Sequence, residues 1–383
     1  MRTVGLIVNP VSGMGGAVGL KGTDGKETLV KAIELGARPV AIGRARTFLS
    51  GFRAVRTAVD FLTYPGEMGE HAFDGLGLRC RVLPGKQECT TGDDTKRAAV
   101  AMAREGAAAI AFCGGDGTAR DVLDAVGHGT PVIGVPAGVK MQSGVFAVNP
   151  AAAAEIVIRF LWGELPLREG EVADVDEEAF RAGRLSSKLY GYLSVPYEPA
   201  AVQGMKSASR LTDESDDNRM AVAKWLVENM QDGVVYVLGP GTTVKAVNEL
   251  LGIEGSLLGV DLVLDGKLLA KDVSEDDAIE ALSGKAAKIV VSPIGKQGFI
   301  FGRGNQQISG RVLERAGREN VIVISTREKL NGIDALRVDT GNPVVDAAFE
   351  GGIKVLVDYN TFRIKKMAVR FGKEGTGWVA EIH

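Results

Sequence analysis

The chain has 383 residues, 45% of them hydrophobic and 6% aromatic, which suffices for a large core and favours two domains. Its 45 Lys and Arg against 48 Asp and Glu give a formal net charge of −3, without the basic excess that nucleic acid or an anionic membrane requires. Three His and three Cys without paired spacing argue against catalysis by several imidazoles, a zinc ribbon and a disulfide framework. We therefore expect a small-molecule substrate as partner, and neither nucleic acid nor a membrane.

The first predicted strand, 3–8, is a short apolar run without a charged leader or the length of a membrane span, which predicts a cytoplasmic protein. In the glycine-rich loop that follows, 9–16, Asn9, Ser12 and Gly13 would offer polar groups and a close backbone approach to a phosphate. The loop lacks the Gly-Lys-Ser or Gly-Lys-Thr of a Walker motif, and its glycine spacing fits the dinucleotide fingerprint poorly. A hydride-transferring Rossmann enzyme is therefore the weaker alternative.

Up to residue 135, short strand-like runs alternate with helical stretches, which predicts a Rossmann-like parallel sheet covered by helices. Further strands are expected at 79–83, 107–113 and 131–135, and helices at 26–35, 93–105 and 118–126. The run 107–113 is apolar throughout, as is typical of a central strand that is buried on both faces. The loop after it should open at the carboxyl edge of the sheet, where open α/β sheets bind ligands.

That loop reads Gly114-Gly115-Asp116-Gly117-Thr118 and lies between the buried strand and a predicted helix. Backbone N–H groups and the positive end of the helix would converge there on an anion, and glycines let a phosphate reach the main chain. A carboxylate beside a phosphate is repelled unless it binds a metal, orients a hydroxyl or accepts its proton, which are roles in phosphoryl transfer. Gly and Asp also dominate ordinary turns, but the position between strand and helix favours a phosphate site.

Asn149-Pro150 predicts the start of a capped helix that closes a first domain, 1–165, and a second, mixed α/β domain follows at 166–383. Helices of the second domain are expected at 218–230, 242–251 and 275–282, and strands at 188–195, 233–238, 257–264, 288–291 and 320–325. The topology of this second domain is not predicted.

Three further groups could contact a ligand. Lys140 follows a strand at the same edge and could neutralise a phosphoryl group, although a solvated surface lysine is an equal alternative. The second domain repeats the arrangement of a strand followed by a glycine loop with hydroxyl groups, which could make a second phosphate contact. Its residues are Gly239, Gly241, Thr242 and Thr243. Arg303 and Asn305 stand in a glycine frame that could read a phosphate, a ribose or a base edge, or form an ordinary hairpin.

Two motifs together, Asn9-Pro10-x-Ser12-Gly13 and the loop 114–118, resemble those of the superfamily of NAD kinases, diacylglycerol kinases and sphingosine kinases. More narrowly, the chain resembles the prokaryotic ATP-NAD kinase family, which includes the acetoin-operon kinase-like proteins. This resemblance is carried by the segments Gly-Leu-Lys-Gly-Thr-Asp-Gly (19–25), Gly-Gly-Asp-Gly-Thr-Ala-Arg-Asp (114–121), Pro-Ala-Gly-Val-Lys-Met (136–141) and Gly-Arg-Gly-Asn-Gln-Gln (302–307).

The resemblance implies an NAD kinase-like fold and transfer of the γ-phosphoryl group of ATP, assisted by Mg²⁺, to the adenosine ribose 2′-hydroxyl of NAD. Asp116 would activate that hydroxyl, and the flanking glycines with Thr118 would hold phosphate. The Asn-Glu pair that grips the ribose in NAD kinases is not recognisable, and 239–243 replaces their Gly-Ser-Thr-Ala loop.

There are three alternatives to this reaction. A kinase for another small hydroxylated metabolite stays open, as does a nucleotide-binding regulator without turnover. A lipid kinase ranks low, because no basic amphipathic helix is visible. We also expect a homo-oligomer, and the sequence assigns no metal ligands.

Overall fold

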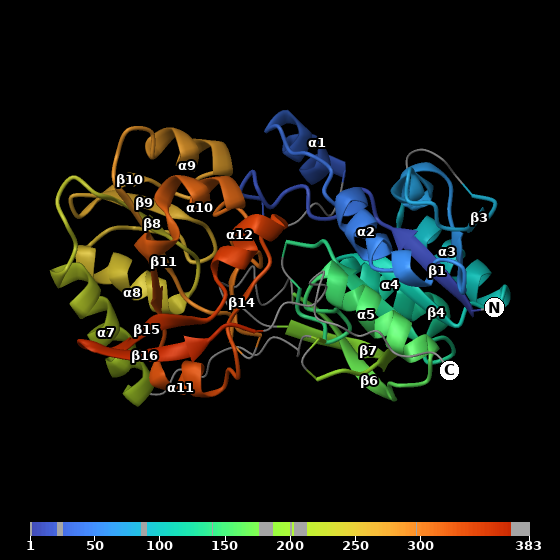
Figure 1. The fold of residues 1–383 in the computed structure, drawn as a ribbon. Coiled ribbons are helices and arrows are strands. Elements are labelled where there is room, and N and C mark those ends of the chain that lie inside the picture. Colours follow the sequence, from blue (N-terminus) through green and yellow to red (C-terminus); the bar gives the residue numbers. More distant parts are fainter. Residues whose placement is uncertain are drawn as a thin grey trace.

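The structure is a computed structural model that describes residues 2–20, 26–85, 90–139, 141–175, 187–199, 201–202, 213–295 and 297–368. Two sheets, each with its own hydrophobic core, form the two halves of the molecule (Figure 1). Within the described residues, no helix combines the length and the apolar character that crossing a membrane demands.

The first sheet is parallel, with the strand order β3-β2-β1-β4-β5. Its strands are β1 (Arg2–Val8), β2 (Val59–Thr63), β3 (Cys80–Val82), β4 (Ala109–Gly114) and β5 (Val132–Pro136). Every residue of β4 is buried, which confirms the predicted central strand. The order places the ends of β1, β4 and β5 beside one another, so that the loops after them share one edge of the sheet.

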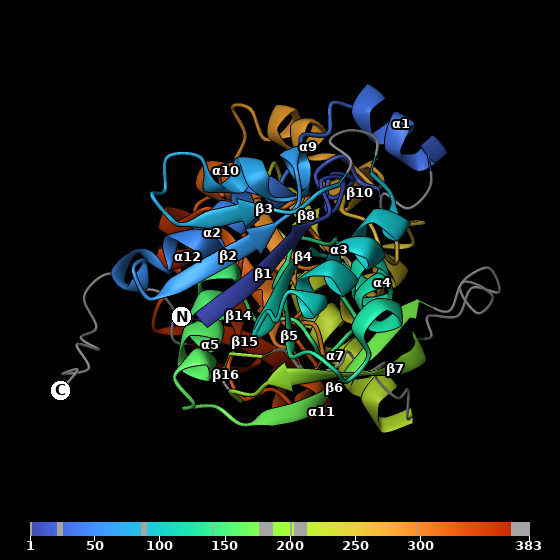
Figure 2. The same ribbon diagram turned by 90° about the vertical axis from the view of Figure 1, so that its right-hand side faces the viewer.

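Helices cover both faces of this sheet. They are α2 (Ala41–Ser50), α3 (Gly92–Arg104), α4 (Asp116–Val126) and α5 (Pro150–Leu161), with 3₁₀ turns η1 (Arg53–Val55), η2 (Gly66–Met68) and η3 (Glu70–Phe73). A further helix, α1 (Lys26–Glu34), stands away from the sheet (Figure 1). α2 packs with α5 and α3 packs with α4, on opposite sides of the strands (Figure 2). The predicted cap of α5 is confirmed, because the Asn149 side chain accepts a hydrogen bond from the N–H of Ala152 at 2.8 Å.

An antiparallel hairpin, β6 (Leu167–Val175) and β7 (Ser187–Pro196), lies beneath the first sheet (Figure 1). Its buried residues Val172, Leu193 and Val195 belong to the core of the first half. The domain boundary at 165 stays a prediction, and by core packing this hairpin goes with the first sheet.

The second sheet is mixed, with the order β10-β9-β8-β11-β13-β15-β16. Its strands are β8 (Val235–Leu238), β9 (Asp261–Leu264), β10 (Lys267–Ala270), β11 (Ala287–Val291), β13 (Val321–Ile324), β15 (Gly352–Asp358) and β16 (Thr361–Lys366). The four central strands β8, β11, β13 and β15 are parallel, and the outer strands β9 and β16 pair antiparallel to their neighbours, as β10 does to β9. A separate pair joins β12 (Phe299–Phe301) to β14 (Arg337–Val338).

Helices again cover the second sheet. They are α7 (Asp213–Glu228), α8 (Thr242–Leu251), α9 (Glu275–Ala281), α10 (Gly310–Ala316), α11 (Arg327–Asn331) and α12 (Pro343–Ala348), with the 3₁₀ turn η4 (Arg318–Asn320). The expected two-part α/β fold, a parallel sheet followed by a mixed sheet, is confirmed. The two halves meet through backbone hydrogen bonds from the N–H of Glu275 to the carbonyl of Ala17 and from the N–H of Gly304 to that of Val139.

Candidate functional site

The loops after β1, β4 and β5 meet at the carboxyl edge of the first sheet, as the sequence predicts. The Asn9 side chain donates a hydrogen bond to Thr118 Oγ1 at 3.0 Å and so ties the first loop to the start of α4. The carbonyl of Gly114 accepts hydrogen bonds from the N–H groups of Ala137 and Gly138 at 3.0 and 3.1 Å. These bonds hold the three loops in one rigid cluster.

Glycine is required where these loops touch. Gly13 has a φ of +80°, and a Cβ at this position would lie 2.0 Å from the carbonyl oxygen of Ala137. A Cβ on Gly115 would lie 3.2 Å from the Cα of Gly138, and 3.7 Å from Ser12 Oγ. Three glycines and Ser12 therefore pack backbone against backbone, which explains part of the glycine usage by packing rather than by ligand contact.

Replacing Gly13 with alanine should lower the free energy of unfolding by roughly 1–3 kcal/mol, because the added methyl group overlaps a backbone oxygen that cannot move alone. Gly106→Ala is the matched control, since Gly106 has a φ of +77° and a Cβ added there would meet no described atom within 4 Å. Urea unfolding of both variants measures the difference. An equal loss in the two variants would mean that backbone conformation, and not loop contact, sets the cost.

Asp116 is the first residue of α4 and is only 5% exposed. The helix thus begins two residues before the predicted Thr118, with Gly115 as N-cap. Asp116 Oδ2 accepts a hydrogen bond from the N–H of Gln142 at 2.6 Å, and Oδ1 accepts from the N–H and the hydroxyl of Ser143 at 3.0 and 2.6 Å. The carboxylate therefore faces the segment that follows β5.

Burial strips water from this carboxylate and raises the pKa of Asp116 to about 7, although the three hydrogen bonds act in the opposite direction. From the sequence alone an ordinary carboxylate pKa is expected for Asp116, and burial in the fold makes that expectation wrong. A carboxyl group with a pKa near neutral pH can take up and release a proton under working conditions, which an ordinary aspartate does poorly.

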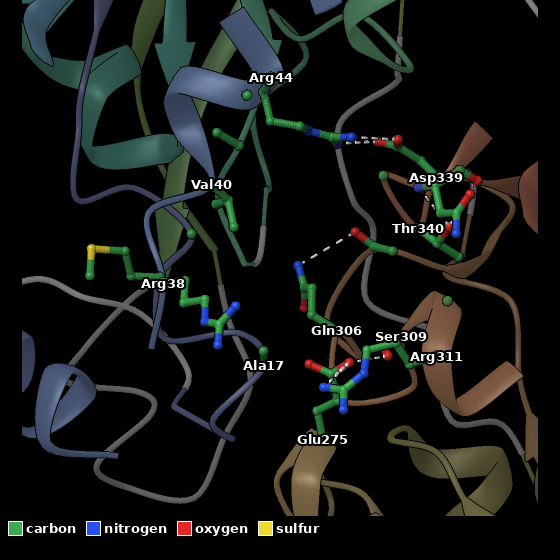
Figure 3. Close-up of a pocket in the computed structure, with 18 of the residues that line it drawn as sticks. Ala17, Arg38, Val40, Arg44, Glu275, Gln306, Ser309, Arg311, Asp339 and Thr340 are labelled. Carbon is green, nitrogen blue, oxygen red and sulfur yellow. Dashed lines mark hydrogen bonds and ion pairs between the residues drawn. The ribbon is translucent and has the colours of Figure 1, made fainter. Parts of the chain in front are cut away.

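A cavity of about 1090 Å³ lies between the two halves (Figure 3). This is at the upper end of the roughly 300–1,000 Å³ that ligand pockets occupy. One wall comes from the loop after β1, the start of α2 and the start of α5, and the other comes from the segments before α9, α10 and α12. Gly13, Gly138 and Arg303 line it, so the cavity borders the loop cluster, whereas Asp116 is not part of its lining.

A buried ion cluster joins the two walls. Arg44 of α2 donates through Nη1 and Nη2 to the two carboxylate oxygens of Asp339, the first at 2.7 Å, and through Nε to the carbonyl of Pro136 at 2.8 Å. Arg303 Nη1 donates to Asp339 Oδ2 at 2.7 Å, and its Nη2 donates to the carbonyl of Val148 at 3.0 Å. Burial opposes ionisation of Asp339, but the two guanidinium groups outweigh it and hold its pKa below the ordinary value.

The remaining predicted residues lie apart from this cavity or carry other bonds. Asn305 donates to the carbonyl of Ile300 at 2.9 Å and accepts from the N–H of Gly302 at 3.2 Å, so its side chain shapes its own loop. The second glycine loop, Gly239, Gly241, Thr242 and Thr243, begins α8 and is not part of the cavity lining. Lys140 lies outside the described residues. Their roles in binding stay predictions.

Sequence reasoning missed Arg44, Asp339 and Ser143. Helix α2 shows a usable signal, since its buried residues Ala41, Ala45, Phe48 and Leu49 have amphipathic helical spacing. No such signal marks Asp339 or Ser143, which reach the site only through the fold.

A resident metal centre is not formed by the described residues. They contain no group of three His, Cys, Asp or Glu side chains close enough to hold an ion. Asp121, the other carboxylate in the first half of α4, pairs with Lys96 of α3 at 3.7 Å. Around Asp116, two backbone N–H groups and the Ser143 hydroxyl donate to the carboxylate. The described side chains therefore form no Mg²⁺ site held by the protein alone.

Comparison with known families gives a match in each half. Residues 4–165 match the ATP-NAD kinase N-terminal domain, and residues 231–367 match the ATP-NAD kinase C-terminal domain. Together the two matches take in most of the chain and every predicted site residue. No curated protein matches the chain.

Proposed function

Because the chain belongs to the ATP-NAD kinase family, we propose that it transfers the γ-phosphoryl group of ATP to the adenosine ribose 2′-hydroxyl of NAD. The observation that carries this proposal is the match of both halves to that family, with the Asp116 loop at the junction of β4 and α4. Catalysis of this kind rests on positioning and on neutralising charge, for which glycine loops at a helix N-terminus are suited.

Asp116 is the proposed base for the acceptor hydroxyl. Its pKa of about 7 suits a general base better than an ordinary carboxyl group does. An ionised carboxylate offers about four lone-pair directions, and the three donors from Gln142 and Ser143 leave one of them on Oδ2. An acceptor hydroxyl that donates to this position would complete the set. No step is assigned to a protein-held metal; Mg²⁺ would arrive on the phosphates of ATP.

Ser143 should set the pH dependence of the reaction. Its hydroxyl donates to Asp116 and also lies 2.8 Å from the carbonyl of Ala173, so its single proton can serve only one of them. Ionised Asp116 attracts that proton, which stabilises the carboxylate. The base must be ionised to act, so turnover should rise with pH through about 7.

Ser143→Ala should move the rising limb of the pH–rate profile upward by about one pH unit, because one hydrogen bond to the carboxylate is lost. The measurement is kcat between about pH 5.5 and 9, on either side of the expected midpoint. Ser194→Ala is the control, since Ser194 Oγ donates to the carbonyl of His128 away from Asp116. A profile that stays in place in Ser143→Ala would remove Asp116 as the titrating base.

An acceptor screen tests the proposal at the level of substrate class. Purified protein with ATP and Mg²⁺ would be given NAD, other nucleosides and small hydroxylated metabolites, and ADP release measured for each. A kinase for another metabolite is the second candidate, because the ribose-gripping Asn-Glu pair is not recognisable and the dipeptide Asn248-Glu249 lies in α8, where Asn248 donates to Asp261. ATP binding without ADP release for any acceptor would indicate a regulator. The acetoin-operon branch and the homo-oligomer stay predictions.

A further inference from the structure

We propose that the wall of the cavity at the start of α2 binds the phosphate groups of a nucleotide or dinucleotide, with Arg44 as the main anion ligand. This inference assigns a phosphate site separate from the Asp116 loop, and it goes beyond the proposed reaction because it concerns binding alone. Figure 3 shows Arg44 and Arg38 reaching into the cavity from one wall, opposite Asp339, Gln306 and Arg311.

Charge at this end of the cavity favours an anion. Asp339 pairs with both Arg44 and Arg303, and the Asp346 carboxylate accepts from the N–H and hydroxyl of Thr340. Arg38 also lines the cavity, on the same wall as Arg44 (Figure 3), so three guanidinium groups of the described lining stand against these two carboxylates and one positive charge is in excess. At the opposite end, Arg311 is paired with Glu275 and Asp276, so the excess charge stays near α2.

Unused N–H hydrogen-bond donors lie beside this positive charge. A guanidinium group has five N–H donors, and the contacts of Arg44 with Asp339 and Pro136 use three of them. Its side chain keeps 17% of its surface exposed, at the cavity wall. Arg303 is only 4% exposed, and its Nε is buried without a hydrogen-bond partner among the described residues. Within the described part of the chain, Arg44 on the α2 wall thus retains two N–H donors, and Arg303 on the opposite wall has an unpaired Nε that lies buried behind the cavity surface.

The start of α2 adds backbone donors. Its N-cap residue Val40 makes no side-chain capping bond, and the first turn contains no acidic residue. The first N–H groups of a helix have no partner within it and attract anions. A Cβ added to Gly43 in this turn would meet no described atom within 4 Å, although glycine inside a helix lowers stability. A phosphate resting on the helix start would explain that open space.

Pyrophosphate, ADP and NAD are the probes for this site, measured by calorimetric titration of the whole chain. Thr47→Glu adds a negative charge one turn along the cavity wall, at an exposed position whose hydroxyl donates to the carbonyl of Gly43. It should weaken pyrophosphate binding by about tenfold or more, without changing Tm. Thr57→Glu, an exposed position outside the cavity lining, is the control for the same charge change and should leave binding unchanged.

Arg38→Gln and Arg44→Gln complete the series, each expected to weaken pyrophosphate binding, with Tm recorded because Arg44 also pairs with Asp339. A loss confined to ADP would assign the wall to the phosphoryl donor, and a loss confined to NAD would assign it to the acceptor. Unchanged pyrophosphate affinity in Thr47→Glu and Arg38→Gln, or no pyrophosphate binding by the wild type, would overturn the inference. These readouts need no turnover, so a failed kinase assay would leave them intact.

Discussion

Replacing Asp116 with asparagine should lower the rate of phosphoryl transfer by about 10²–10⁴-fold, which is the usual contribution of a positioned base. The amide has nearly the same shape as the carboxylate but cannot accept a proton. Asp116 is not part of the cavity lining, so nucleotide binding should change little. The measurements are kcat under saturating ATP and acceptor, and Kd for ATP by calorimetric titration.

The control is Asp121→Asn in the same helix, where the carboxylate faces Lys96 rather than the loop cluster. It should keep kcat within a few-fold of the wild type. Tm of both variants is needed, because the Asp116 amide cannot accept every hydrogen bond from Gln142 and Ser143. Equal losses of kcat and ATP affinity in Asp116→Asn would indicate a structural role for this residue instead.

Asp339→Ala should lower the free energy of unfolding by about 3–5 kcal/mol, because it leaves buried guanidinium charges without a counter-ion. Arg303 and Asp339 are 2% and 4% exposed as side chains, so little water solvates the guanidinium group in place of the carboxylate. The variant also removes the ion pair from Arg44 that joins the two halves. Denaturant unfolding followed by fluorescence and by circular dichroism would measure the loss.

Asp60→Ala is the matched control, since Asp60 pairs with Arg79 at 2.8 Å with 31% and 49% of the two side chains exposed. A surface pair of this kind contributes only about 0–1 kcal/mol. The lowered pKa of Asp339 also fixes how the stability of the protein depends on pH. Ionised Asp339 contributes fully to the free energy of unfolding above the ordinary pKa of 3.8, and this contribution is lost as the pH falls through the lower pKa of the folded state. Similar losses of unfolding free energy in Asp339→Ala and Asp60→Ala would contradict a stabilising role for the buried ion cluster.

Much of the first sheet could be predicted, because apolar runs and capped helices carry local signals. Asn149 and the wholly buried β4 are examples. The order of the strands in the second sheet could not be predicted, because short apolar strands pair according to tertiary packing. The predicted strand 257–264 shortens to Asp261–Leu264, because the Asp261 carboxylate binds the N–H groups of Ser256 and Asp272 and turns the preceding residues into a loop.

The glycine loops of the site were visible in the sequence, but their partners were not. Arg44 and Asp339 lie 295 positions apart, and nothing local marks either as one half of an ion pair. The raised pKa of Asp116, close to neutral pH, likewise depends on burial beneath Gln142 and Ser143, which only the fold provides. Sequence therefore located the proposed chemistry, while the cavity and its charge required the three-dimensional arrangement.

The most direct test incubates the wild type and Asp116→Asn with ATP, Mg²⁺ and NAD, and identifies the product by mass spectrometry. We predict that the wild type forms NADP with an equal amount of ADP, and that Asp116→Asn forms neither at a comparable rate. No NADP from a folded wild type that binds both ATP and NAD would contradict the proposed acceptor.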